Sequence, residues 1–141
     1  MSVGLLFITH SSVGTAMVET AATMLNACPL QFDLITVGSN DDPDERLASA
    51  AALVEKLDQG DGVLILTDMY GSTPSNIACT LIQRYRVRTV AGINLPMLVR
   101  ILNYPQLPLD ELATRAASGG RDGIFVCPPD DDAFTTTSVL E

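Results

Sequence analysis

Short apolar runs alternate along the chain with longer segments in which apolar residues recur at helical spacing, and this alternation constrains the fold more than any other feature. The runs 3–8, 32–37, 63–67 and 87–93 are typical of β-strands. The third run stays apolar until Thr67, which indicates a central strand covered on both faces. Alternating strands and helices predict a parallel sheet between two helical layers.

The segments between these runs carry the signals for helices. Five helices are expected, and they begin at or near Val13, Pro43, Thr73, Asn94 and Leu109. Gly119-Gly120 is the expected stop of the last helix, near Ser118, and Ile124–Cys127 predicts a short last strand that runs antiparallel or pairs with another subunit. With the common strand order 2-1-3-4, the predicted fold is a single-domain α/β open, mostly parallel sheet with helices on both faces.

The size and charge of the chain limit its domain count and its partners. Its 141 residues suffice for one domain with a full core, which we expect to span 1–127 and to be followed by an acidic, flexible tail at 128–141. The formal net charge of −9 argues against a nucleic-acid partner. No apolar stretch approaches the ~20 residues that span a bilayer, and the amino terminus lacks the features of a signal peptide. We therefore expect a cytoplasmic protein without direct membrane insertion.

The three cysteines are Cys28, Cys79 and Cys127, and they lie far apart in the sequence. They form no CxxC pair, and a single histidine cannot complete a zinc finger with them. We expect buried, reduced thiols and no metal site.

His10 is the only histidine, and it follows the first strand where small polar residues begin. Asp68 follows the third strand and Asn94 follows the fourth. The carboxyl ends of parallel strands share one edge of the sheet, and a crevice opens where neighbouring strands send their helices to opposite faces. We expect His10 and Asp68 to meet at this crevice.

Such a pair supports nucleophilic chemistry. A carboxylate that accepts a hydrogen bond from one ring nitrogen fixes the tautomer and leaves the other nitrogen free to attack. Backbone N–H groups after His10 and around Gly71 lie at helix amino ends, which favour a bound anion, and phosphate is the natural candidate. The hydroxyls that add possible donors belong to Thr9, Ser11, Ser12, Ser72 and Thr73.

Each of these residues also has a structural interpretation. A lone histidine is more often structural or simply exposed than catalytic, and Asp68 alone would suit a helix or turn cap. Thr73-Pro74 alone is ordinary helix capping. The position of His10 at the end of a strand makes a functional role more frequent than for an average histidine, while the structural interpretation remains the more common one from spacing alone.

Three stretches of sequence together form a family pattern, and they are Leu5-Leu6-Phe7-Ile8-Thr9-His10, Thr67-Asp68-Met69-Tyr70-Gly71-Ser72-Thr73-Pro74-Ser75-Asn76 and Gly92-Ile93-Asn94-Leu95-Pro96-Met97-Leu98. This pattern resembles the IIA component of the mannose-type phosphotransferase system over roughly 1–126. Ser11 departs from it, because glycine often follows the histidine in that family. The His-Ser pair is similar to the related phosphocarrier subunit that serves dihydroxyacetone kinase, whereas residues 71–76 favour the mannose-type branch.

The resemblance implies a cytoplasmic phosphocarrier, usually a homodimer, that works through a phosphohistidine and without a metal, nucleotide or other cofactor. It accepts a phosphoryl group from the phosphocarrier protein HPr and passes it to a IIB component, through which it contacts the membrane components IIC and IID. Carried over, His10 is the phosphorylated residue and Asp68 its hydrogen-bonding partner. Ser72 and the neighbouring amides receive the phosphate oxygens. The last strand, Ile124–Cys127, is exchanged between subunits.

Other functions are compatible with the residues. The chain could be a regulatory phosphoprotein whose phosphorylation state is read by a partner without sugar transport, or the phosphocarrier subunit for dihydroxyacetone kinase. A flavodoxin-like small-molecule binder is disfavoured, because the first strand–helix turn lacks a GxGxxG or Walker pattern and aromatic residues are few.

Overall fold

The four apolar runs form one parallel sheet. A computed structural model describes residues 2–127 and contains the strands β1 (Gly4–His10), β2 (Phe32–Val37), β3 (Val63–Thr67) and β4 (Val87–Ala91). Their order is β2-β1-β3-β4, and all three strand pairs are parallel, which confirms the predicted sheet. Strand β3 is buried along its whole length, and β2 and β4 are the edges of the sheet. This order makes β1 and β3 neighbours, as the predicted crevice requires.

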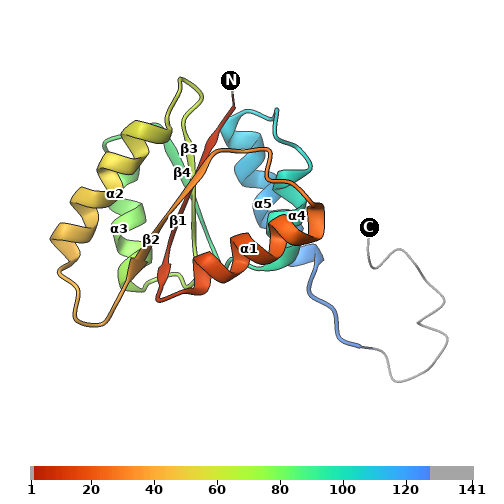
Figure 1. Cartoon of the computed structure of the whole chain (residues 1–141), viewed down its shortest axis with the longest axis horizontal. Coiled ribbons are helices and arrows are strands. Elements are labelled where there is room, and N and C mark those ends of the chain that lie inside the picture. Colours follow the sequence, from red (N-terminus) through yellow and green to blue (C-terminus); the bar gives the residue numbers. More distant parts are fainter. Residues whose placement is uncertain (1, 128–141) are drawn as a thin grey trace.

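Helices cover both faces of the sheet (Figure 1). One layer consists of α2 (Pro43–Leu57) and α3 (Thr73–Ile82), and the other of α1 (Val13–Leu25), α4 (Leu95–Leu102) and α5 (Leu109–Asp122). Successive strand side chains point to opposite faces and therefore supply two separate cores. Leu6 and Ile8 of β1 pack toward α2 and α3, whereas Leu5 and Phe7 pack toward the other layer.

Two of the helices that follow strands are capped at their amino end by the side chain of the preceding residue. Asp42 accepts the N–H of Asp44 at 3.0 Å at the start of α2. Asn94 accepts the N–H of Met97 at 2.9 Å at the start of α4, and its amide group donates to the carbonyl of Gly120 at 3.0 Å. The polar residue after β4 thus caps one helix and ties it to the next.

Helix α5 is longer than predicted. It runs through Gly119-Gly120 to Asp122, whereas the sequence predicts that these glycines end it. The two glycines lie where α5 packs against α4: a Cβ on Gly119 would lie 2.6 Å from the Cβ of Arg100, and one on Gly120 would lie 3.0 Å from Met97. They allow close contact between the helices, so their absence of a side chain serves packing rather than termination.

One further prediction about the described residues, the burial of the cysteines, is wrong. Cys79 and Cys127 are exposed and Cys28 is half-buried, so the expected burial of the thiols does not hold. Cys79 lies on the outer face of α3, and the buried face of that helix includes Ile77, Ala78 and Leu81.

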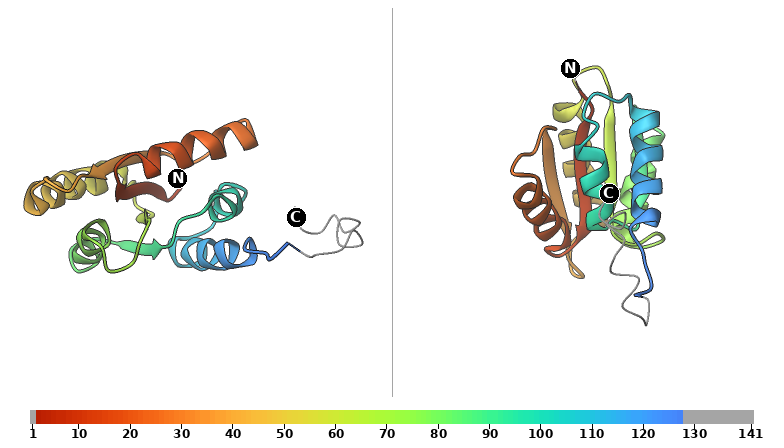
Figure 2. Two further views of the ribbon diagram at one scale, coloured as in Figure 1. Left: turned by 90° about the horizontal axis from the view of Figure 1, so that it is seen from below. Right: turned by 90° about the vertical axis from the view of Figure 1, so that its right-hand side faces the viewer.

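Residues 124–127 form no strand within the single chain. Ile124 and Val126 are 73% and 94% exposed, and the segment after α5 leaves the body of the molecule (Figure 2).

The exchange of residues 124–127 between subunits stays a prediction, and the predicted tail 128–141 lies outside the described residues. Within residues 2–127, no helix has both the length and the apolar character needed to cross a membrane.

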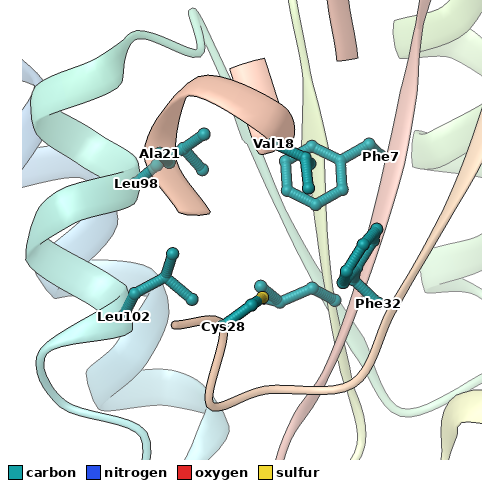
Figure 3. Close-up of a pocket in the computed structure, with 8 residues that line it drawn as sticks. Phe7, Val18, Ala21, Cys28, Phe32, Leu98 and Leu102 are labelled. Carbon is teal, nitrogen blue, oxygen red and sulfur yellow. The ribbon is translucent and has the colours of Figure 1, made fainter. Parts of the chain in front are cut away.

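A small apolar cavity of about 10 Å³ lies in the core between β1, α1 and α4 (Figure 3). Phe7 and Phe32 meet edge to face beside it, with ring centroids 6.4 Å apart, and Val18 and Leu98 complete part of its wall. Its volume is about that of a single water, and its lining offers too few polar partners to hold one. We interpret it as a packing defect, and neither His10 nor Asp68 lines it.

Candidate functional site

His10 and Asp68 meet at the carboxyl edge of the sheet. His10 is the last residue of β1, and Asp68 directly follows β3, which pairs with β1 through Ile8 and Thr67. One carboxylate oxygen of Asp68, Oδ2, accepts the backbone N–H of His10 at 3.0 Å and lies 2.9 Å from Nδ1 of the His10 ring. The two residues that the sequence places at neighbouring strand ends are thus in direct contact.

This contact determines which ring nitrogen is free. Because an ionised carboxylate only accepts hydrogen bonds, the neutral His10 ring carries its proton on Nδ1 and its lone pair on Nε2. The His10 side chain is 48% exposed, whereas that of Asp68 is 15% exposed. The arrangement holds a half-exposed imidazole in one orientation by means of a largely buried carboxylate.

The carboxylate of Asp68 remains ionised in this position. Its burial alone raises the pKa, but the hydrogen bonds from the His10 backbone and ring, together with the charge of the ring when it is protonated, outweigh burial and hold the pKa below the ordinary value of 3.8. At neutral pH, Asp68 is therefore a fixed negative charge that stabilises positive charge on the His10 ring.

The turn after β1 is stabilised by a hydrogen bond to the side chain of Thr9. Its buried hydroxyl accepts the N–H of Gly14 at 2.9 Å, which fixes the first turn of α1 against the strand. Ser11 lies between Thr9 and Gly14 in the sequence and has φ +43°, in the left-handed region that glycine adopts more readily. The hydroxyl of Thr9, a candidate donor in the sequence, is thus engaged inside the protein.

The turn between β3 and α3 is closed by its own hydrogen bonds. The carbonyl of Met69 accepts both the N–H of Ser72 at 3.3 Å and its hydroxyl at 2.6 Å. The N–H of Gly71 donates to the hydroxyl of Ser75 at 3.3 Å, and Gly71 has φ +85°. The N–H groups of Gly71 and Ser72, which the sequence assigns to phosphate, are engaged within the turn in this structure.

In helices α1 and α3, which follow β1 and β3, the N-cap residue itself supplies no side-chain cap. Their N-cap residues, Ser12 and Ser72, make no capping hydrogen bond, in contrast to those of α2 and α4. At α3, the N–H groups of Thr73 and Ser75 have no hydrogen-bond partner within residues 2–127. Free N–H groups at a helix amino end attract anions.

The structure therefore brings some of the predicted site residues into contact, whereas the hydroxyls of Thr9 and Ser72 make hydrogen bonds within the protein. His10 and Asp68 are in contact, and Gly71, Ser72 and Thr73 belong to the turn and helix start that follow Asp68. Sequence reasoning missed that Ser75 stabilises this turn. A serine three positions after Ser72, in the first turn of a helix, is the signal that could have revealed it.

No three histidine, cysteine, aspartate or glutamate side chains among residues 2–127 lie together in a way that could hold a metal ion. The groups that the structure places at the site are the imidazole of His10, the carboxylate of Asp68, and the hydroxyl and backbone N–H groups of the two turns.

Comparisons with known proteins converge on one family. The family model described as the PTS system fructose IIA component matches residues 4–114. The PTS system mannose-specific EIIAB components of Escherichia coli (strain K12) and Shigella flexneri are 28% identical over an alignment of 127 residues that covers 88% of this chain. The chain spans 39% of the length of these relatives.

Two solved structures have the same fold. The mannose/sorbose specific IIA subunit from Enterococcus faecalis superposes with a TM-score of 0.82 at 23% identity and covers 93% of this chain and 98% of its own. The phosphotransferase system component EIIA from Streptococcus agalactiae gives a TM-score of 0.76 at 18% identity, over 88% of this chain and 96% of its own.

Proposed function

Because the chain belongs to the fructose and mannose IIA family of the sugar phosphotransferase system, we propose that it is a cytoplasmic phosphocarrier. In this proposal, His10 accepts a phosphoryl group from phospho-HPr and passes it to a IIB component. The observation that carries the proposal is the 2.9 Å contact between Nδ1 of His10 and the ionised carboxylate of Asp68. This contact leaves Nε2 with the lone pair, on a side chain that is 48% exposed and thus accessible to a partner protein.

The transfer step needs alignment and charge stabilisation more than covalent machinery. The lone pair of Nε2 attacks phosphorus in line, the bond between phosphorus and the donor breaks, and its electron pair stays on the donor. The His10 ring then carries positive charge, which Asp68 stabilises through Nδ1. Transfer to the next protein reverses the step, and the ring returns to its neutral form with the proton still on Nδ1.

The phosphoryl oxygens need donors as the charge develops. The unpaired N–H groups of Thr73 and Ser75 at the start of α3 are available for this purpose, and the helix dipole adds to their effect. Ser72 can contribute its hydroxyl only if it leaves the carbonyl of Met69. In our proposal, the amide groups are thus the primary oxyanion donors and Ser72 is a secondary one, with Ser11 and Gly71 shaping the two turns.

The test is incubation with HPr, its phosphoenolpyruvate-dependent kinase and labelled phosphoenolpyruvate. We expect about one labelled phosphoryl group per chain, stable in base and labile in acid as expected of a phosphohistidine, and none in His10→Gln. A circular dichroism spectrum equal to that of the wild type establishes that the variant is folded. Label retained by the folded variant would exclude His10 as the acceptor.

The acceptor of the phosphoryl group separates the remaining alternatives. The labelled protein is mixed with a IIB component, with a dihydroxyacetone kinase subunit, or with neither. Transfer to IIB supports a role in sugar transport, and transfer to the kinase subunit supports the other phosphocarrier branch. Retention of the label in both mixtures favours a regulatory phosphoprotein.

We also propose that the protein is a homodimer that exchanges residues 124–127. Strand β4 is an edge of the sheet, and the apolar side chains of Ile124, Phe125 and Val126 are largely exposed in the single chain. A free edge and an exposed β-branched segment are complementary. Light scattering tests this: the expected mass is that of two chains, and Ile124→Asp combined with Val126→Asp should lower it to that of one.

A further inference from the structure

Two large side chains stand out in solvent in the turn between β3 and α3. Met69 is 65% exposed and Tyr70 is 82% exposed. They are consecutive, and they directly follow Asp68. Scattered exposed apolar side chains need no explanation, but a consecutive pair in the turn that carries the candidate carboxylate does.

The exposure of this pair is a fixed property of the turn. The carbonyl of Met69 accepts two hydrogen bonds from Ser72, and Gly71 donates to the buried Ser75. These bonds close the backbone around Tyr70 and leave its side chain no route into either core. A turn that is held in this way presents the two side chains without a large entropic cost on binding.

The same turn is connected to His10 through one carboxylate. Oδ2 of Asp68 binds the backbone and ring of His10, and Oδ1 accepts the N–H of Met69 at 3.0 Å. The exposed pair and the imidazole are therefore held in a fixed relation on the same edge of the sheet. A protein surface that reaches the ring of His10 from solvent meets this pair beside it.

Acidic side chains gather after β2, the strand that pairs with β1 on the side away from β3. His10 pairs with Val37 at the end of β2, and the chain then enters the start of α2. This stretch carries four exposed carboxylates and a single basic residue, the half-buried Arg46; the carboxylates belong to Asp41, Asp42, Asp44 and Glu45. A free phosphate is repelled by such a rim, whereas a protein that brings its own positive charges is attracted.

We propose that Met69 and Tyr70 form the docking anchor for the protein that delivers the phosphoryl group, and that this protein has an apolar centre bordered by basic side chains. This rests on the function proposed above. Tyrosine is enriched among the interface residues that dominate binding energy, and methionine adapts to more than one partner surface. The pair therefore suits a surface that binds a donor and an acceptor in turn.

The test compares a protein donor with a small one. Phosphorylation of the wild type and Tyr70→Ala is measured with phospho-HPr and with phosphoramidate, which needs no docking. With phospho-HPr we expect KM to rise about tenfold or more in Tyr70→Ala with kcat within twofold, and Tyr70→Phe to remain close to the wild type. With phosphoramidate the rates should agree within twofold.

Ile82→Ala is the matched control, because Ile82 is an exposed apolar residue at the other end of α3 (41%) and should leave both donors unaffected. An unchanged KM in Tyr70→Ala overturns the docking proposal alone, and so does an equal loss with phosphoramidate. A change in oligomeric mass on Tyr70→Ala also overturns it, since a second copy then covers the residue. Failure of phospho-HPr to label the wild type refutes the proposed function, and the docking proposal with it.

Discussion

Replacement of Asp68 by asparagine tests the electrostatic part of the site with little change in shape. The asparagine side chain has the size of the aspartate, and its amide oxygen, in the position of Oδ2, can still accept both hydrogen bonds from His10. It loses the negative charge that faces Nδ1 at 2.9 Å. It also loses the second acceptor oxygen, which takes the N–H of Met69 at 3.0 Å.

The size of the effect follows from the kind of hydrogen bond that is lost. A hydrogen bond to a charged group contributes about 1.5–3 kcal/mol and a neutral one about 0.5–1.5 kcal/mol. The charge on the ring develops during transfer, so the difference of about 1–2 kcal/mol falls on the transition state. This corresponds to phosphoryl transfer that is about 5- to 30-fold slower.

The assay is rapid-quench transfer of labelled phosphate from phospho-HPr under single-turnover conditions. Asp110→Asn serves as the control, because Asp110 is an exposed aspartate at the start of α5 with an ion-pair partner of its own, Arg88. The control should react at the rate of the wild type. A rate in Asp68→Asn within twofold of the wild type would show that the carboxylate has a structural part only.

Three further outcomes are expected. Because folding lowers the pKa of Asp68, the carboxylate stabilises the folded protein above the ordinary value near 3.8, and this stabilisation is lost as the pH falls through the folded-state pKa. In urea unfolding, the difference in unfolding free energy between the wild type and Asp68→Asn should be constant at neutral pH and shrink in acid. A difference that stays constant down to the lowest measurable pH would contradict this. Thr9→Val leaves the N–H of Gly14 without an acceptor and should destabilise the protein by about 1–3 kcal/mol, whereas Thr9→Ser should cost less, and equal losses in chemical denaturation would speak against the hydrogen bond. Thr67 has a buried hydroxyl without a partner in residues 2–127, so Thr67→Val should raise the free energy of unfolding by about 1 kcal/mol, and a loss of stability would reveal a partner for that hydroxyl.

The sheet could be predicted because its central strands carry an unambiguous pattern. A run such as Val63–Leu66 has no polar residue on either face and fits only a position between two helical layers. The strand order then places the residues after β1 and β3 side by side, so the contact between His10 and Asp68 follows from topology. No side-chain detail was needed to predict it.

The turns could not be predicted in the same way. Whether Ser72 offers its hydroxyl to a ligand or to the carbonyl of Met69 depends on turn geometry that composition does not reveal. A glycine in a sequence can indicate either the end of a helix or a close contact between helices. Gly119 is of the second kind, because it lies inside α5 and packs closely against Arg100. The exposure of Cys79 depends on which face of α3 packs against the sheet. That face carries Ile77, Ala78 and Leu81, and Cys79 lies on the opposite one.

The proposed phosphoryl transfer requires Nε2 of His10 to be the atom that receives the phosphoryl group. The most direct measurement is a ¹H–¹⁵N correlation spectrum of the His10 ring before and after phosphorylation by phospho-HPr. Before the reaction, we expect the proton on Nδ1; afterwards, we expect phosphorus on Nε2 with Nδ1 still protonated beside Asp68. Phosphorus on Nδ1, or a ring that is unchanged while label is incorporated elsewhere, would contradict the account.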